Sequence, residues 1–454
     1  MKQLKFRALA VLFLVGGLVF GTAFFLGSYM ADGAAWASSR VNASAYSGAH
    51  LARGALLARD GELLYDAEAD EYAANAALRK AALHLTGDRA GNIGRSAAAA
   101  LADRMVGFSP LTGLSDKGHD VYLTVDADLQ SLASSCLSGQ KGAAILYDYR
   151  TGEVLCAASA PTFDPLSPPM DAETNPAYDG VYLNRAFSGL FAPGSVFKLV
   201  TATAAVEKIG GLAGRTFTCT GRLEFGEQTV TCPHAHGEMD FATALAHSCN
   251  CAFAELSLEL GGETLRAYAE KLGLLTSFSV SGIPTAAGSF SVAESEGDLA
   301  WSGVGQYTDM VCPAAMLRLV GGIANGGVAV TPRLFLKETG AFSLPVPTGS
   351  GKKSERLLKA ETADCLRDLM RNNVTVEYGN IFGGHDVGAK SGTAEVGEGK
   401  SPHAWFVGFV AEEEMPVAFA VIVQNGGAGL SVAGNVAAKL VREAERLYTP
   451  DEAE

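Results

Sequence analysis

The sequence is short of positive charge and of cysteine. Its 454 residues carry 35 lysines and arginines against 49 aspartates and glutamates, which gives a formal net charge of −14. A nucleic-acid partner would require a basic patch or stripe, so this balance argues against one. The eight cysteines are too few for a disulfide scaffold in a chain of this length. Internal repeats and long low-complexity tracts are also missing, and the composition is that of a globular protein with room for more than one domain.

Long apolar runs are missing as well, except at the start of the chain. Three basic residues within the first seven positions precede an uncharged stretch over residues 8–31, and Asp32 follows it. As a helix that rises ~1.5 Å per residue, this stretch spans about 36 Å and can cross a bilayer. The flanking charges place the N-terminus in the cytoplasm and the rest of a single-pass cell-membrane protein outside. The alternative is a cleaved signal peptide, because residues 35–37 have the small-x-small form of a cleavage site.

The remaining patterns predict an α+β fold. We expect three regions: a cytoplasmic tip and transmembrane anchor at 1–31, a small stalk at 32–118, and the main domain at 119–450. Within the main domain a strand hairpin comes first, at 142–159, and a second hairpin lies near the end, at 404–423. Helical patterns dominate between them. The sequence therefore predicts an antiparallel sheet assembled from both ends of the domain, with a helical subdomain inserted between its two halves.

Local signals predict several further elements. In the stalk, residues 53–65 have the pattern of two strands joined by an Asp-Gly turn, and Ser96 caps a short helix. In the main domain a strand leads into a helix that opens near Asp126, and Pro313 fits the first position of a later helix. An amphipathic helix over residues 432–448 closes the domain.

One serine–lysine pair stands in an unusual setting. Ser-x-x-Lys occurs at 138–141 and 350–353 in polar, Gly-containing contexts that indicate turns, but at 195–198 it opens an apolar helix after a Pro-Gly turn. At i, i+3 the hydroxyl of Ser195 and the amine of Lys198 share a helix face. Burial disfavours the charged amine and lowers its pKa, as a general base requires. The alternative is a capping serine followed by a lysine that reaches out to solvent.

A second motif, Ser248-Cys249-Asn250, lies between two helical stretches. Its hydroxyl can relay a proton, and its amide can hold a substrate carbonyl. A third motif, KSGT at residues 390–393, comes just before the last hairpin, so we expect it on an edge strand. There Gly392 would let a ligand approach the backbone closely, and the lysine with its two neighbouring hydroxyls would dock a carboxylate.

In this order the three motifs resemble the active-site signature of penicillin-binding proteins and serine β-lactamases. Other stretches resemble the transpeptidase domain of class B penicillin-binding proteins: LTVDADLQ, YRTGEVLCAASAPTFDP, NRAFSGLFAPGSVFK, GVGQYTDMVCPAAM and HAWFVGF. RGALLARDG is similar to the class B motif Arg-Gly…Asp-Arg-Asn-Gly, although residues 58–60 stand slightly off that pattern. The short N-terminal region is similar to that of the smaller class B proteins of Gram-positive bacteria.

The resemblance implies a penicillin-binding, β-lactamase-like transpeptidase fold and a peptidoglycan D,D-transpeptidase that cross-links stem peptides and is inhibited by β-lactams. Ser195 would attack the carbonyl between the two terminal D-alanines. Lys198 would take its proton, and Ser248 would return a proton to the leaving D-alanine. An amine from a neighbouring stem peptide would then resolve the acyl-enzyme, with no cofactor or metal required.

The same resemblance assigns the binding residues. Asn250 would position the donor backbone, while Lys390, Ser391 and Thr393 would bind the terminal carboxylate. The backbone N–H groups of Ser195 and Thr393 would form the oxyanion hole. The chain departs from the family in having cysteine between Ser248 and Asn250 and serine rather than the commoner threonine after Lys390, and neither change removes a needed group.

Three other interpretations of the same motifs stay open at this point. A β-lactamase would need a carboxylate that activates a deacylating water, and the motifs supply none. A carboxypeptidase would differ only in its acceptor cleft. A β-lactam sensor would carry extra membrane spans and a cytoplasmic protease part, which the sequence does not suggest. A bifunctional synthase is excluded, because it would carry a glycosyltransferase domain that the sequence does not suggest either.

A transpeptidase of class B type would instead work beside a SEDS-type glycosyltransferase, and Gly16, Gly17 and Gly21 would permit close helix contact with it.

One cysteine pair stands out from the other six cysteines. In CTGRLEFGEQTVTC, Cys219 and Cys232 are symmetric about residues 225–226, so a hairpin turning there would set them opposite each other. This predicts a cross-strand disulfide that is a structural accessory away from the site. Free thiols, or a zinc site that includes His234 and His236, are the alternatives.

Overall fold

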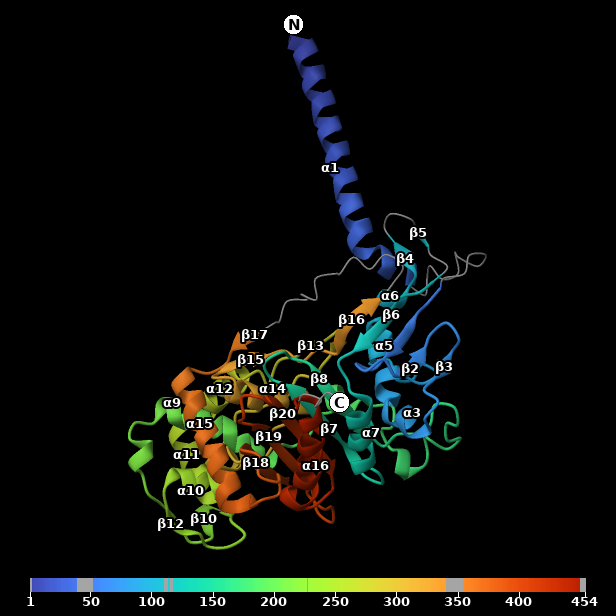
Figure 1. Ribbon diagram of the computed structural model, residues 1–454. Helices are drawn as coiled ribbons and strands as arrows, with labels where there is room; N and C mark the ends of the chain where they lie inside the picture. The colour runs from blue at the N-terminus through green and yellow to red at the C-terminus, as the bar shows by residue number, and fades with distance from the viewer. Residues whose placement is uncertain are drawn as a thin grey trace.

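The computed structural model describes residues 2–38, 52–109, 113–114, 117–226, 228–339 and 354–449, so the serine–lysine pair at 350–353 lies outside the described residues. Helix α1 (Lys2–Ser38) extends away from the rest of the molecule (Figure 1). Its segment Lys5–Ala37 is long and apolar enough to cross a membrane, and it is the one such helix among the described residues. The chain thus has an N-terminal apolar helix that is consistent with a single membrane anchor.

A five-stranded sheet follows α1, in the order β16-β6-β1-β2-β3. Its strands are β1 (Ala55–Leu57), β2 (Leu63–Asp66), β3 (Glu71–Tyr72), β6 (Asp120–Leu123) and β16 (Phe335–Thr339). The predicted stalk hairpin is confirmed, because β1 and β2 pair antiparallel with Leu56 opposite Tyr65. Strands β6 and β16 come from the main domain, so this sheet combines strands from both sides of the expected boundary at residue 118.

Short elements complete this region: α3 (Ala76–Ala81), α4 (Leu83–Thr86), α5 (Ala97–Ala100), α6 (Ala102–Met105), β4 (Phe108–Ser109) and β5 (Gly113–Leu114). Ser96 caps α5 as predicted, since its side chain accepts a hydrogen bond from the backbone N–H of Ala99 at 3.2 Å. The helix expected after this cap is divided into α5 and α6 at Leu101.

The main domain contains a second, antiparallel five-stranded sheet in the order β18-β19-β20-β7-β8. Its strands are β18 (Val387–Ala394), β19 (His403–Val410), β20 (Val417–Gln424), β7 (Lys141–Asp148) and β8 (Val154–Ala160). Both predicted hairpins are present, and β20 pairs with β7 along its whole length. The sheet is therefore assembled from both ends of the domain, as the sequence predicted, and β18 forms its edge.

Helices cover both faces of this sheet (Figure 1). One face packs against α7 (Ala127–Cys136), η5 (Leu430–Gly434) and α16 (Asn435–Ala444), around a core that includes Phe406 and Phe419. Asp126 caps α7 as predicted, accepting from Leu129 N–H at 2.9 Å. The other face packs against α14 (Pro313–Ala324), every residue of which is buried and which begins at the predicted proline.

The inserted subdomain is mainly helical, as expected. Its helices are α8 (Arg185–Ser188), η2 (Gly194–Phe197), α9 (Lys198–Lys208), α10 (Phe241–Ala246), α11 (Asn250–Leu260), α12 (Gly262–Lys271), α13 (Glu296–Ser302), α15 (Ala360–Asn373) and η4 (Val374–Tyr378). Short strand pairs connect them: β12 (Gly237–Met239) with β9 (Phe217–Cys219), β10 (Arg222–Phe225) with β11 (Gln228–Thr231), β13 (Ser279–Val280) with β14 (Ile283–Pro284), and β15 (Val328–Val330) with β17 (Ser354–Arg356).

The β10–β11 hairpin turns one residue later than the sequence suggested. Phe225 pairs with Gln228, so Cys232 lies opposite Gly221, to whose carbonyl oxygen its N–H donates at 2.9 Å. Cys219 pairs instead with Gly237, in the neighbouring two-stranded sheet. The predicted disulfide between Cys219 and Cys232 is therefore wrong in this structure, and both side chains are free thiols.

Candidate active site

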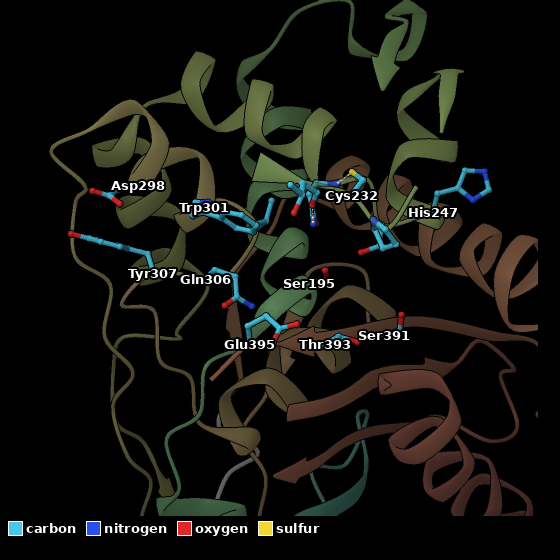
Figure 2. Close-up of a pocket in the computed structure, with 15 residues that line it drawn as sticks. Ser195, Cys232, His247, Asp298, Trp301, Gln306, Tyr307, Ser391, Thr393 and Glu395 are labelled. Carbon is cyan, nitrogen blue, oxygen red and sulfur yellow. Dashed lines mark hydrogen bonds between the residues drawn. The ribbon is translucent and has the colours of Figure 1, made fainter. Parts of the chain in front are cut away.

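A pocket of about 670 Å³ lies between the helical subdomain and the edge strand β18. Figure 2 shows Ser195 near its centre, with Ser391 and Thr393 on the strand side and Cys232 on the opposite side. The lining contains residues from all three predicted motifs: Ser195, Ser248, Asn250, Ser391 and Thr393. Tertiary folding thus brings the three motifs to one cavity, and the other predicted residues lie directly behind this lining.

Ser195 occupies the first turn of the helix formed by η2 and α9. Gly194 has φ 53°, and a Cβ there would lie 2.6 Å from the carbonyl oxygen of Thr393. Only glycine therefore fits the tight Pro-Gly turn that presses the serine segment against β18. The Gly194 N–H donates to Gly305 O at 2.8 Å, which fixes the turn from its other side.

Lys198 is fully buried one turn below Ser195. Its Nζ donates to Ser248 O at 2.6 Å, to Asn250 Oδ1 at 2.7 Å and to Ser248 Oγ at 3.1 Å. Burial lowers the pKa of the Lys198 amine to about 8, and the nearby thiol of Cys249 opposes this shift. The lowered pKa agrees with the sequence prediction and leaves a useful fraction of neutral amine near neutral pH.

Lys390 is also fully buried, and its Nζ lies on the far side of Ser248. It donates to Ser248 Oγ at 3.0 Å and to Ser391 O at 2.8 Å. Burial, together with the like charge of Lys198, holds the pKa of Lys390 well below its usual value. The hydroxyl of Ser248 therefore bridges two buried amines. Lys390 does not contribute to the pocket lining, so its amine acts on the cavity from behind Ser248 and Ser391.

Ser248 sits in a strained turn between α10 and α11. Its φ of 54° is in the left-handed region, which non-glycine residues rarely adopt. The next residue, Cys249, caps α11, with its Sγ accepting from Ala252 N–H at 3.5 Å. Asn250 then donates from Nδ2 to Thr231 O at 2.7 Å. Strain of this kind persists only where the surroundings hold it, and here the two residues that follow Ser248 take part in holding it.

The KSGT strand is positioned by a residue that sequence reasoning missed. Tyr378, at the end of η4, accepts the Ser391 N–H at 2.8 Å and donates its hydroxyl to Ser391 Oγ at 3.0 Å. Burial raises the pKa of Tyr378 to about 12, so this hydroxyl stays protonated and can donate. Tyr378 stands 13 residues before Ser391, and no local pattern linked the two.

Gly392 lies where three protein groups pack closely around the strand. A Cβ at this position would lie 2.9 Å from Val196 Cγ1, 3.0 Å from Trp405 Cβ and 3.1 Å from Pro193 O. The missing side chain thus makes room for the serine segment and for the neighbouring strand. The expected edge strand itself is confirmed, since β18 pairs on one side only, with β19.

The opposite wall of the pocket contains a group of residues that the sequence placed elsewhere. Thr231 and Cys232, after the β10–β11 hairpin, line the cavity, so the prediction that this hairpin stays away from the site is wrong. The side-chain ligand atoms of Cys219, Cys232, His236 and Cys249 all lie within 4.8 Å of one another. We name these four residues the cysteine–histidine cluster. Among the described residues it is the group that could hold a metal ion.

Comparison with known proteins agrees with this geometry. Residues 142–442 match the family model of the penicillin-binding protein transpeptidase domain. The chain is 30% identical over 353 residues to the peptidoglycan D,D-transpeptidase PbpA of Mycolicibacterium smegmatis, covering 72% of each protein. It is 28% identical over 355 residues to PbpA of Mycobacterium tuberculosis, again covering 72% of each.

Solved structures show the same fold. The D,D-transpeptidase domain of a peptidoglycan glycosyltransferase from Eggerthella lenta superposes with a TM-score of 0.75 at 27% identity, covering 88% of this chain and 100% of that one. Penicillin-binding protein A of M. tuberculosis, solved as a penicillin G acyl-enzyme, gives a TM-score of 0.73 at 23% identity, with coverage of 87% and 100%. With three converging motifs and a family match over two thirds of its length, this chain belongs to the penicillin-binding protein transpeptidase family, as a serine transpeptidase of class B similar to PbpA.

Proposed function

We propose that this chain is a peptidoglycan D,D-transpeptidase that cross-links stem peptides through an acyl-enzyme on Ser195 and is acylated there by β-lactams. The observation that carries this proposal is the pair of buried amines on either side of Ser248 Oγ, 3.1 Å from Lys198 Nζ and 3.0 Å from Lys390 Nζ. These three groups lie beside the pocket in which Ser195 is half-buried. They supply a general base and a route for the proton.

In the first step the Ser195 Oγ attacks the carbonyl between the two terminal D-alanines of a donor stem peptide. The neutral amine of Lys198 takes the hydroxyl proton as the new C–O bond forms. The backbone N–H groups of Ser195 and Thr393 receive the oxyanion, because the serine turn and β18 are in contact at this point.

In the second step the C–N bond breaks and the leaving amine of D-alanine receives a proton from the Ser248 hydroxyl. Ser248 is replenished from Lys198, whose amine is already hydrogen-bonded to it. The hydrogen bond that Lys390 Nζ donates to Ser248 Oγ favours loss of the Ser248 proton. An amine from a second stem peptide then attacks the acyl-enzyme, gives up its proton along the same route, and releases Ser195 with a new amide cross-link formed.

The side chains that line the cavity bind the donor stem peptide. Asn250 holds the donor backbone, and the hydroxyls of Ser391 and Thr393 bind the terminal carboxylate. Lys390 contributes to this binding through its charge, and Gly392 keeps β18 close to the serine segment. We propose these assignments on the positions of the side chains in the pocket.

The proposal is tested with purified full-length protein, lipid-linked nascent peptidoglycan strands and a separate polymerase. We expect cross-linked dimers of stem peptides together with an equimolar release of D-alanine, and both should stop after pre-incubation with penicillin. Release of D-alanine without dimers would make the enzyme a carboxypeptidase. Steady hydrolysis of penicillin would make it a β-lactamase.

We also propose that α1 anchors the enzyme with its N-terminus in the cytoplasm and its catalytic domain outside the cell membrane. The basic residues before the apolar segment support this orientation. Residues 32–118 would then act as a pedestal that sets the height of the pocket above the membrane. Cross-linking acts on strands that a polymerase makes at the membrane, and a SEDS-type glycosyltransferase in the same membrane is the partner that we propose.

The surface of α1 is compatible with such a partner. Gly16, Gly17 and Gly21 make no contact with other parts of the described chain, and their small size allows another helix to approach closely. Replacing α1 by an unrelated span of equal length should reduce co-purification with the polymerase and cross-linking in cells. If both are unchanged, the helix only anchors, and any partner contact lies in the remainder of the protein.

A further inference from the structure

The cysteine–histidine cluster gathers four segments that are separated in sequence. Cys219 ends β9, Cys232 follows β11, His236 precedes β12, and Cys249 caps α11. Cys219 and Cys249 are buried, while Cys232 and His236 are half-buried. Such a convergence of three thiols and one imidazole has no role in the acyl-transfer chemistry derived above.

The distances within the cluster match the edges of a tetrahedron around a metal. Cys232 Sγ lies 3.8 Å from Cys249 Sγ, and Cys219 Sγ lies 3.4 Å from His236 Nδ1. With Zn–S near 2.3 Å and Zn–N near 2.0–2.1 Å, tetrahedral geometry gives edges of roughly 3.8 Å between two sulfurs and roughly 3.6 Å between sulfur and nitrogen. These two distances are therefore close to those of a zinc site, and all pairs of ligand atoms lie within 4.8 Å of one another.

The surroundings of the sulfurs also suit metal-bound thiolates. Backbone N–H groups donate to each of the three: Asn250 N–H to Cys232 Sγ at 3.1 Å, Gly221 N–H to Cys219 Sγ at 3.4 Å, and Ala252 N–H to Cys249 Sγ at 3.5 Å. Hydrogen bonds of this kind orient ligands and stabilise their charge in metal sites. Three sulfurs and one imidazole nitrogen in a tetrahedral arrangement are a ligand set that selects zinc.

We propose that the cysteine–histidine cluster binds one Zn²⁺ ion, and that this ion fixes the turn carrying Ser248 and Asn250. All four ligand positions come from the protein, so the site is structural and leaves no open position for a substrate. Cys249 is the middle residue of the Ser-x-Asn motif, so a bond from its sulfur to the metal acts directly on the strained turn at Ser248. This proposal replaces the expectation from the sequence that the chain needs no metal.

The metal would join the β9–β12 segment to the start of α11, next to the turn at Ser248. Cys219, Cys232 and His236 belong to the β9–β12 segment, and Cys249 belongs to the start of α11. Asn250 already links these two parts by hydrogen bonds: its side chain donates to Thr231 O, and its backbone N–H donates to Cys232 Sγ. The second part of the proposal rests on the proposed function, because it assigns the ion the task of holding the residues that relay the proton.

A fourth sulfur lies close to the cluster and makes a competing reaction, disulfide formation, possible. Cys251 Sγ is 3.6 Å from Cys232 Sγ, so oxidation outside the cell could join Cys232 to one of its neighbours instead. A disulfide at Cys232 would remove a ligand and exclude zinc. The two states are therefore mutually exclusive, which makes the proposal testable by peptide mapping as well as by metal analysis.

The first experiment measures zinc in the full-length chain purified in detergent. We expect one Zn²⁺ per chain, with Co²⁺ substitution giving the charge-transfer absorption of bound thiolates. Cys232→Ser and His236→Gln should lower zinc affinity by about tenfold or more in chelator competition, whereas the matched controls Cys365→Ser and His234→Gln should not. Cys365 is exposed, and His234 stands two residues from His236 but is outside the cluster. Zinc-free wild-type protein, or a disulfide at Cys232 in non-reduced digests, would overturn the proposal.

The second experiment tests the link to catalysis in the wild-type chain, so that no variant needs to fold. Removing zinc with a chelator should slow acylation by fluorescent penicillin by about tenfold or more, in the range seen when the support of a metal site is lost. Adding Zn²⁺ back should restore the rate, and Mg²⁺ should not. Unchanged acylation after complete removal would overturn the role of the ion in fixing Ser248. Ser195→Ala should bind zinc normally and remain unlabelled, which separates failure of this site from failure of the proposed function.

Discussion

The two walls of the pocket are built in opposite ways. The strand wall, formed by β18 and the η2–α9 segment, is part of the core: β18 pairs with β19 over its full length, and Lys198 and Lys390 are fully buried. The hairpin wall, formed by residues 217–239, consists of strands three or four residues long in two separate two-stranded sheets. Such short pairs are marginal without further support.

This difference shows how the protein divides two tasks. The lowered pKa values of the buried lysines depend on a dry, rigid environment, which the strand wall supplies through packing. The hairpin wall has little core of its own, yet it holds Asn250 through Thr231 O at 2.7 Å. A cross-link at the cysteine–histidine cluster would give it the rigidity that packing does not. Substitutions in one wall at a time should therefore distinguish the residues that take part in acylation from those that hold them in position.

The largest effect is expected at the strand wall, from loss of the nucleophile. Ser195→Ala should abolish covalent labelling by fluorescent penicillin with no change in thermal unfolding, because only one oxygen is removed. The other described Ser-x-x-Lys copy gives a matched control: Ser138→Ala, in a surface turn, should label at the wild-type rate. Labelling of the Ser195 variant at that rate would contradict the assignment.

Loss of the base should come next. Lys198→Ala should slow acylation by about 10²–10⁴-fold, the usual range for a general base. Lys198→Arg should not recover the rate, since arginine stays charged and cannot accept a proton. The measurement is the second-order rate constant for labelling, and full recovery with arginine would exclude a neutral amine as the base.

The wild-type pH profile sharpens the same point. With its pKa lowered to about 8 by burial, Lys198 is protonated below this pH and neutral above it. The acylation rate should therefore rise with pH through about 8 and then level off. A rate that falls over this interval would mean that the charged amine is the active form.

An intermediate effect is expected where the strand wall meets the serine segment. Gly392→Ala would bring a Cβ within 2.9 Å of Val196 Cγ1 and should cost about 1–3 kcal/mol of stability, with slower acylation, because β18 and the serine turn must move apart. Gly210→Ala serves as control, since nothing lies within 4 Å of the added atom. Thermal unfolding and labelling are measured together. Equal stability of the two variants would show that β18 can move away from the serine segment without lowering the free energy of unfolding.

The smallest effect is expected from one hydroxyl. Tyr378→Phe keeps the ring but leaves the Ser391 N–H and Oγ without their partner, which should cost about 1–2 kcal/mol and slow acylation several-fold. Tyr448→Phe removes a hydroxyl that donates to Asp148 Oδ2 at 3.1 Å, away from the pocket, and should lower stability alone. If both variants acylate equally well, Tyr378 does not position the KSGT strand.

Much of the architecture followed from local sequence. Alternating and apolar runs with turn signals predicted the two hairpins of the main sheet, and the caps at Ser96 and Asp126 predicted helix starts, because these features depend on residues within one or two turns. The three motifs predicted the nucleophile and its buried lysine, since the apolar positions around Lys198 are visible in its own helix. The long N-terminal run likewise predicted the apolar helix α1.

Other features depended on contacts between distant segments. The hairpin register shifted by one residue, so that Cys232 pairs with Gly221 rather than with Cys219, because register is set by packing as well as by composition. Strands β6 and β16 joined a sheet that the sequence had assigned to the stalk.

The sequence by itself determined the candidate groups for the chemistry: a serine followed by a lysine on one helix face, a hydroxyl–amide pair, and a lysine on an edge strand. Only the tertiary structure decided that Lys390 faces Ser248 rather than the open pocket, and that Tyr378 holds Ser391. It also decided that thiols from three segments meet one imidazole beside the catalytic turn. The physical reason is range: helix faces and caps are fixed by neighbours a few residues away, whereas these contacts exist only once the whole core has packed and brought together residues that no local pattern relates.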